Sequence, residues 1–185
     1  YYPTSASPIS EGQGANIACS IWGTNVRDWA ISPSIYLIDT NQNNPANYQV
    51  EMDVRLTNSN GGEPTVSTDD KFAVVISTDN GLSWTQRNAT IWSNETGAER
   101  NYGDFSSTAT HIVIPLMDTN NTYLRNDTIK IGIYVESTVS SSGTNVIYVD
   151  NLALNQIPSC PSVYGLNLNL VSSSSVRVNF ATNNV

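Results

Sequence analysis

Apolar and polar residues alternate along five stretches of this 185-residue chain. The stretches are Tyr48–Thr57, Lys71–Thr78, Thr110–Leu116, Ile129–Ser137 and Asn145–Leu154. Because successive side chains of a strand point to opposite faces, this two-residue period predicts strands that are buried mainly on one face. No part of the chain shows the period of an amphipathic helix. The pattern predicts an all-β protein.

Polar turn clusters such as Asn58–Pro64 separate these stretches, and Gly and Asn in them adopt positive φ at low cost. Parallel strands need long crossover connections, usually helical, which the chain does not offer. We therefore expect antiparallel pairing, in a two-sheet sandwich or a barrel.

A proline-containing stretch begins at Ile157, after the last of the five alternating stretches, so we expect two domains, 1–157 and 158–185. The second segment has a Pro-flanked linker and two alternating strands, Tyr164–Leu170 and Val176–Phe180, joined by a serine-rich turn. It resembles the first strands of a fibronectin type III-like β-sandwich, with Phe180 where that family usually has Trp. Fewer than 30 residues cannot bury enough apolar surface to fold alone, so we expect a fragment of such a domain.

Composition narrows the possible partners. The net charge is -8, from 16 acidic and 8 basic residues, so we expect no binding to nucleic acid. Only 13% of the residues are charged, while Asn, Ser and Thr abound, which is typical of an extracellular or cell-surface β-protein. No apolar run approaches the ~20 residues that span a bilayer, so we expect no membrane insertion in this segment.

The chain has two cysteines. Cys19 and Cys160 either form a disulfide that ties the ends of the first domain together or are two free thiols.

The stretch Ser77–Trp84 (STDNGLSW) has the spacing of the Asp-box, a hairpin signature that recurs in the blades of sialidases and related propellers. A propeller needs at least four blades of roughly 40 residues, and the chain has one such box. We therefore interpret it as a hairpin clamp: Asp79 accepts backbone N–H groups, Gly81 takes the left-handed conformation, and Trp84 packs beneath.

Three segments in order, Asp28–Leu37, Asp69–Gln86 and Val146–Leu154, resemble the MAM-like jelly rolls of Bacteroidetes surface proteins. These include the cleaved-adhesin modules of gingipains and other type IX-secreted proteins with varied C-terminal anchors. The resemblance implies a two-sheet antiparallel jelly-roll sandwich for 1–157 and a role in adhesion. The strand that usually opens this family is missing here.

Two carboxylates fall on the apolar parity of their strands. Counted by twos, Asp70 aligns with Phe72, and Asp150 aligns with Tyr148. An inward carboxylate is costly unless it is hydrogen-bonded or bound to a cation, and oxygen ligands without His or Cys favour Ca²⁺. The resemblance implies the same structural calcium, with Asp69 and Asn151 as further candidate ligands. The alternative is capping by backbone N–H groups or basic side chains.

Catalysis is not expected. The single histidine, His111, lies opposite in parity to Ile112 and Ile114, which predicts a surface position rather than a Ser-His-Asp site. Six scattered arginines do not supply the cluster that holds a sialic acid carboxylate. We expect no catalytic residues.

Ligand binding and modification have fewer candidates. Trp29 and Trp84 belong to the family motifs and are expected in the core, which leaves Trp22 and Trp92 as candidate sugar-binding residues, or as packing residues. Thr128, in Asp-Thr-Ile, matches a pattern for bacterial O-glycosylation, whereas Asn88, Asn94, Asn120 and Asn126 occupy N-glycosylation sequons.

The sequence thus predicts a non-catalytic adhesion, binding or spacer module of a large secreted or surface protein. Its partners would be a glycan or protein on another surface and other modules of the same polypeptide. The alternative is an accessory carbohydrate-binding module of a secreted hydrolase, which requires an exposed Trp22 or Trp92.

Overall fold

The computed structural model describes residues 2–4, 16–21, 26–38, 46–65, 70–125, 127–137, 144–157, 163–172 and 175–182. The chain forms two compact units, Tyr1–Asn155 and Gln156–Val185. Each unit is described by itself.

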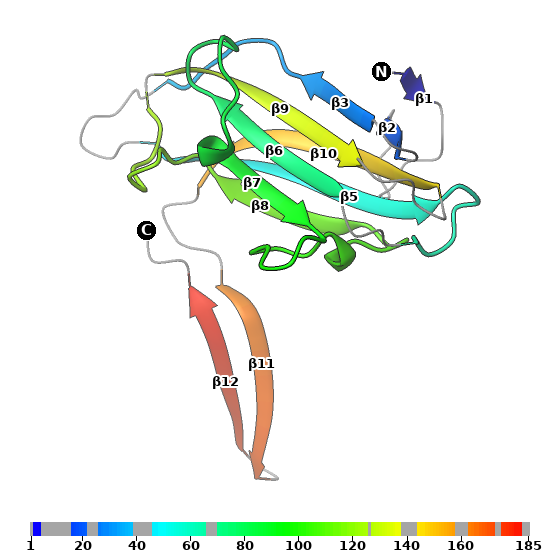
Figure 1. Ribbon diagram of the computed structural model, residues 1–185. Coiled ribbons are helices and arrows are strands. Elements are labelled where there is room, and N and C mark those ends of the chain that lie inside the picture. Colours follow the sequence, from blue (N-terminus) through cyan, green and yellow to red (C-terminus); the bar gives the residue numbers. More distant parts are fainter. Residues whose placement is uncertain are drawn as a thin grey trace. The chain divides into compact units, whose positions relative to one another are not determined.

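Unit 1 is a sandwich of two sheets (Figure 1). Sheet A has the order β1 (Tyr2–Thr4), β2 (Asn16–Ile21), β10 (Asn145–Gln156), β5 (Tyr48–Asn58) and β8 (Thr110–Pro115). Sheet B has the order β3 (Val26–Ile31), β9 (Thr128–Ser137), β6 (Lys71–Ser77) and β7 (Ala89–Ser93), and β4 (Ile35–Tyr36) also pairs with β9. Two short 3₁₀ helices, η1 (Gln86–Asn88) and η2 (Tyr102–Asp104), follow β6 and β7.

The chain passes back and forth between the sheets, at β2 to β3, β4 to β5, β5 to β6, β7 to β8, β8 to β9 and β9 to β10. The pairs whose register the structure gives are antiparallel, for example β3 with β9 and β5 with β8. This exchange of strands between two antiparallel sheets is the jelly-roll arrangement. The predicted all-β, two-sheet antiparallel jelly roll is confirmed.

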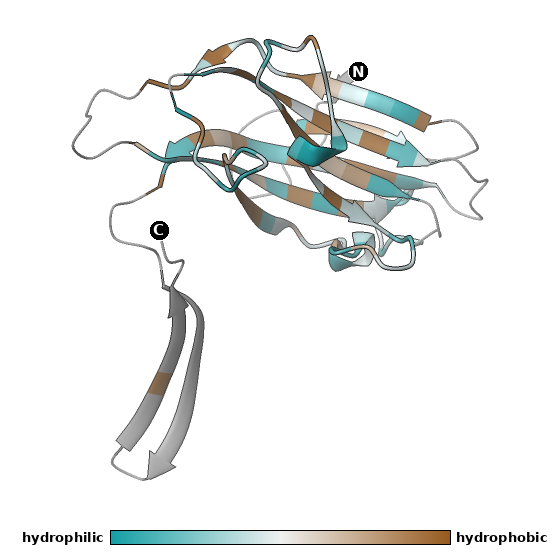
Figure 2. Ribbon diagram, turned by 60° about the vertical axis from the view of Figure 1, so that its left-hand side comes forward, coloured by the Kyte–Doolittle hydropathy of each residue, from teal (hydrophilic) through white to brown (hydrophobic). Residues whose placement is uncertain are grey.

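The core lies between the sheets and is built from alternate residues of each strand. On β5 these are Val50, Met52, Val54 and Leu56, and on β9 they are Ile129, Ile131, Ile133 and Val135. Figure 2 shows the corresponding alternation of hydrophobic and hydrophilic bands along the strands. Strand β6 differs because Ala73 and Val75, on its outer side, are buried as well.

An aromatic cluster fills one part of the core. Trp92 pairs in register with Phe72, and their ring centroids are 5.5 Å apart. Phe105 lies 5.4 Å from each of them. Trp92 is only 7% exposed, so the prediction that it binds a ligand at the surface is wrong. Its place opposite Phe72 on β7 turns the indole inward.

Strand β10 changes parity along its length. Ile147 and Val149 are buried before the change, and Leu154 packs against the core after it. Asn151, between them, has a φ of 52°. A β-bulge adds one residue to a strand, so the side chains after it point to the opposite faces, and the bulged residue often has a left-handed conformation. The alignment of Asp150 with the inner face is therefore wrong: Asp150 shares the outer parity of Val146 and Tyr148.

Unit 2 consists of β11 (Val163–Ser172) and β12 (Ser175–Thr182), paired antiparallel with Leu168 opposite Val178. The two strands lie where alternation predicts them, and their assignment to a fibronectin type III-like domain stays a prediction.

Among the described residues, no helix has the length and apolar character needed to cross a membrane.

Candidate functional site

The Asp-box forms the hairpin after β6. Asp79 Oδ1 accepts hydrogen bonds from Ser77 Oγ at 2.6 Å and from the Ser83 backbone N–H at 3.0 Å, and Asp79 Oδ2 accepts one from Ser83 Oγ at 2.5 Å. These hydrogen bonds, with that from Ser77 first in size, hold the pKa of Asp79 well below its ordinary value. Gly81 has a φ of 86°, as the clamp requires. The hairpin is therefore fixed by its own contacts.

The hairpin carries Trp84 onto the outer face of sheet B, where it lies directly over Gly132 of β9. A Cβ added to Gly132 would stand 2.6 Å from Trp84 Cζ3 and 2.9 Å from Trp29 Cζ3. A glycine inside a strand marks the close approach of another group, and Gly132 within IKIGIYV is the sequence signal that could have revealed this packing.

Three aromatic rings meet on this face. Trp29 of β3 and Tyr134 of β9 are opposite each other in register, with ring centroids 4.6 Å apart. Trp29 and Trp84 have centroids 5.3 Å apart. Trp29 remains 39% exposed, and Trp84 and Tyr134 are partly exposed. The expectation that Trp29 and Trp84 belong to the core is therefore wrong.

The rings border a depression of about 160 Å³, which we call the aromatic pocket. Small apolar side chains of β6 and β7 form its floor, and polar side chains from β6, β9 and the hairpin complete its rim. Its described lining residues are Trp29, Lys71, Ala73, Val75, Trp84, Thr85, Gln86, Ala89, Ile91, Tyr134 and Glu136.

A charged network lies beside the rings. Lys71 Nζ is 2.8 Å from Glu95 Oε1 and 3.2 Å from Glu136 Oε1, and Arg27 Nε is 3.4 Å from Glu136 Oε2. Tyr134 donates its hydroxyl hydrogen to Glu136. The strand register produces this order, because Glu136 lies opposite both Arg27 and Lys71.

These contacts fix the protonation states of the network. The hydrogen bond to Glu95 raises the pKa of Lys71, although burial opposes it. Burial and the hydrogen bond to Glu136 raise the pKa of Tyr134 to about 12. Burial would raise the pKa of Glu136, but hydrogen bonds from Tyr134 and Lys71 outweigh it and lower that pKa. At neutral pH the pocket thus combines aromatic rings with a carboxylate acceptor and an ammonium donor.

The outer face of sheet A carries a second polar group of residues. His111 Nδ1 is 2.8 Å from Asp53 Oδ1, and His111 Nε2 is 3.5 Å from Glu51 Oε2. Asn151 donates its side-chain N–H to Asp53 Oδ2 at 2.7 Å. His111 lies on the exposed face that parity predicts, with both ring nitrogens facing carboxylates rather than a serine hydroxyl.

Of the four candidate calcium ligands, the structure describes Asp70, Asp150 and Asn151, and these three do not form one site. Asp70 is 1% exposed, as its parity predicts, and accepts a hydrogen bond at 3.3 Å from Asn145 Nδ2. Asp150, on the outer parity of β10, accepts one from the Asn151 backbone N–H at 2.8 Å. Asp69 lies outside the described residues, among which no cluster of three acidic, His or Cys residues could hold a metal. The pair Asp70 and Asp150 does not fit a shared ion, and calcium stays a prediction.

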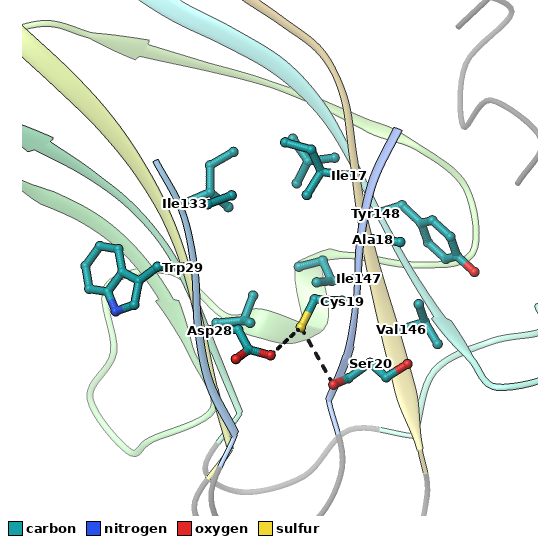
Figure 3. Close-up of a pocket in the computed structure, with 13 residues that line it drawn as sticks. Ile17, Ala18, Cys19, Ser20, Asp28, Trp29, Ile133, Val146, Ile147 and Tyr148 are labelled. Carbon is teal, nitrogen blue, oxygen red and sulfur yellow. Dashed lines mark hydrogen bonds between the residues drawn. The ribbon is translucent and has the colours of Figure 1, made fainter. Parts of the chain in front are cut away.

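Cys19 lies in a cleft of about 510 Å³ between β2 of sheet A and β3 of sheet B (Figure 3). Its Sγ donates a hydrogen bond to Asp28 Oδ2 at 3.2 Å. Burial, together with Asp28, raises its pKa to about 12. Cys160 lies outside the described residues, as does Trp22, so the disulfide and a ligand-binding Trp22 stay predictions.

Thr128, the predicted glycosylation residue, is exposed at the start of β9. Of the sequon asparagines, Asn120 is exposed in a turn, Asn88 and Asn94 are partly exposed, and Asn126 lies outside the described residues.

Comparison with known proteins does not assign this chain to a family. No family model matches the chain, and no curated protein matches it. The resemblance to MAM-like modules therefore stays a prediction. One solved structure, described as "CBM4 structure and function", is similar over 76% of this chain and 83% of its own, at 8% identity and a TM-score of 0.41. These values are too low to transfer a function.

Proposed function

We propose that unit 1 is a non-catalytic module that binds glycans at the aromatic pocket. The observation that carries the proposal is the meeting of Trp29, Trp84 and Tyr134 at the surface, beside Lys71 and Glu136. Exposed apolar side chains that gather in one patch with a polar rim mark an interaction site, whereas single exposed ones do not.

The chemistry of the pocket suits a sugar. One face of a pyranose presents C–H groups that pack against aromatic rings, while its hydroxyl groups both donate and accept hydrogen bonds. Glu136 can accept such bonds, and Lys71 and Gln86 can donate them. A ligand site of this kind joins an apolar surface to a few fixed polar groups.

A glycan-binding site of this kind would suit either of two kinds of parent protein. In an adhesin it would hold a glycan on another surface, and beside a secreted hydrolase it would hold the polymer being degraded. Both place the module outside the cell, as part of a larger polypeptide, and the pocket is the same in each.

The test is binding of the full chain to a glycan array, confirmed by isothermal titration calorimetry. We expect Trp29→Ala and Trp84→Ala to weaken binding by tenfold or more, because each removes one wall of the pocket. Tyr36→Ala is the matched control: Tyr36 is 57% exposed on the same sheet and pairs with Thr128, about 20 Å along β9 from Tyr134. Binding that survives both tryptophan substitutions would refute the site, and a chain that binds no glycan would refute the function.

A further inference from the structure

We infer that the aromatic pocket, if it binds glycans as proposed above, selects uncharged, soluble glycan chains over acidic polymers and over crystalline polysaccharide surfaces. Two independent features of the pocket lead to this inference: its charge balance and the tilt of its rings.

The charges beside the rings cancel. Arg27 and Lys71 face Glu95 and Glu136, and each cation lies within 3.4 Å of a carboxylate. Among the described residues that line the pocket, Lys71 is the one cation, and two carboxylates already hold it. A uronate or sulfate would have to displace a carboxylate from Lys71 while it approached Glu136.

The charge of the whole chain acts in the same direction. At a net charge of -8, the chain repels a polyanion before any contact forms. Neutral hydroxyl groups meet no such barrier, because Glu136 and Lys71 can exchange hydrogen bonds with them without a change in net charge.

The ring geometry excludes a flat surface. The Trp29 and Trp84 planes are inclined by 52°, and the Trp29 and Tyr134 planes by 39°. A crystalline polysaccharide face is planar, so Trp29 cannot lie flat against it together with either of the other two rings. Tilted rings around a depression of about 160 Å³ instead enclose a single sugar unit of a separate chain.

The experiment measures binding of the full chain to three groups of probes. Soluble neutral polymers are hydroxyethylcellulose, arabinoxylan and galactomannan; acidic polymers are polygalacturonate and heparin; crystalline solids are microcrystalline cellulose and chitin. Affinity electrophoresis serves the soluble polymers and pull-down serves the solids. We expect retardation by a neutral polymer, loss of at least tenfold in affinity in Trp29→Ala, and little change from low salt to about 0.5 M salt.

The outcomes separate the inference from the function on which it rests. Trp29-dependent binding to an acidic polymer, weakened by salt, or to a crystalline solid, would overturn the inference and leave glycan binding in place. No binding to any probe or to the glycan array would overturn both. Tyr36→Ala should behave as the unsubstituted chain in every assay.

Discussion

The indole of Trp84 rests on the backbone of Gly132, so closely that no side chain fits between them. This contact joins the Asp-box hairpin to the centre of sheet B and places the ring that closes the aromatic pocket. The first prediction concerns this contact.

Gly132→Ala should push Trp84 and Trp29 away from β9. Because Gly132 is buried and the added methyl group meets two rigid rings, we expect a loss of about 1–3 kcal/mol in the free energy of unfolding. Urea denaturation followed by tryptophan fluorescence measures it. In the double variant Gly132→Ala/Trp84→Leu the loss should be less than additive. Strictly additive losses would show that the two residues do not touch.

Truncation of Trp92 should mainly reduce stability, whereas truncation of Trp29 should mainly reduce ligand binding. Trp92→Ala leaves a cavity in the aromatic core and should cost about 3–5 kcal/mol of stability. Trp29→Ala removes a partly exposed ring and should cost about 1 kcal/mol of stability, while it weakens the proposed glycan binding by tenfold or more. Chemical denaturation and calorimetry on both variants give the comparison. If Trp29→Ala were the more destabilising variant, Trp29 would be a core residue after all.

Asp79 should make the domain less stable in acid. Its pKa is lowered on folding, so its stabilising effect is complete above the unfolded value of about 4 and is lost as the pH falls toward the lower folded value. We expect Asp79→Asn to lower the Tm at pH 7 and the difference from the unsubstituted chain to shrink below about pH 4. Calorimetry across this range measures it. Glu99→Gln, at a carboxylate that is 91% exposed, is the control and should shift the Tm little throughout. A difference that stays constant with pH would contradict the clamp.

Asp70 should matter for stability with or without calcium. Asp70→Ala leaves the amide of Asn145 without its carboxylate acceptor in the core, which should cost about 1–3 kcal/mol. If Asp70 also binds calcium, a chelator should lower the Tm of the unsubstituted chain and leave Asp70→Ala unaffected. Equal melting curves with calcium and with chelator would leave Asp70 with a hydrogen-bonding role alone.

Cys19 should be a slow nucleophile. Because its pKa is raised to about 12, almost none of the thiol is ionised at pH 8, and only the thiolate reacts. We expect iodoacetamide to modify Cys19 slowly in the native reduced chain and rapidly in urea, as measured by peptide mass spectrometry. The same digest before reduction shows whether Cys19 is linked to Cys160. Rapid labelling of the native chain would contradict the burial of the thiol.

The alternation of apolar residues predicted the strands because most of them face the core with one side. It failed at β10, where a single left-handed residue, Asn151, exchanges the two faces and carries Asp150 outward. A local bulge of this kind leaves no mark on the two-residue period before it. Hence the position of β10 was predictable and the direction of its carboxylate was not.

The aromatic pocket was missed for a different reason. Tryptophan is large and apolar in either environment, so its type does not distinguish Trp29 and Trp84, at the surface, from Trp92, in the core. The distinction comes from pairing across strands: Trp92 faces Phe72 and Trp29 faces Tyr134. Such pairings depend on register between distant segments, for which a single sequence gives only indirect signs such as Gly132.

The hairpin Ser77–Trp84 holds its shape through bonds among its own residues, yet it supplies one wall of the pocket. Leu82, at its tip, is 88% exposed, and the neighbouring Thr85 and Gln86 reach the rim. If the pocket binds a ligand as proposed, substitutions at Thr85 and Gln86 would alter what it binds without disturbing the clamp or the core. The residues of the rim are thus separate from those that hold the fold, so the surface of the pocket could change while the sandwich stays the same.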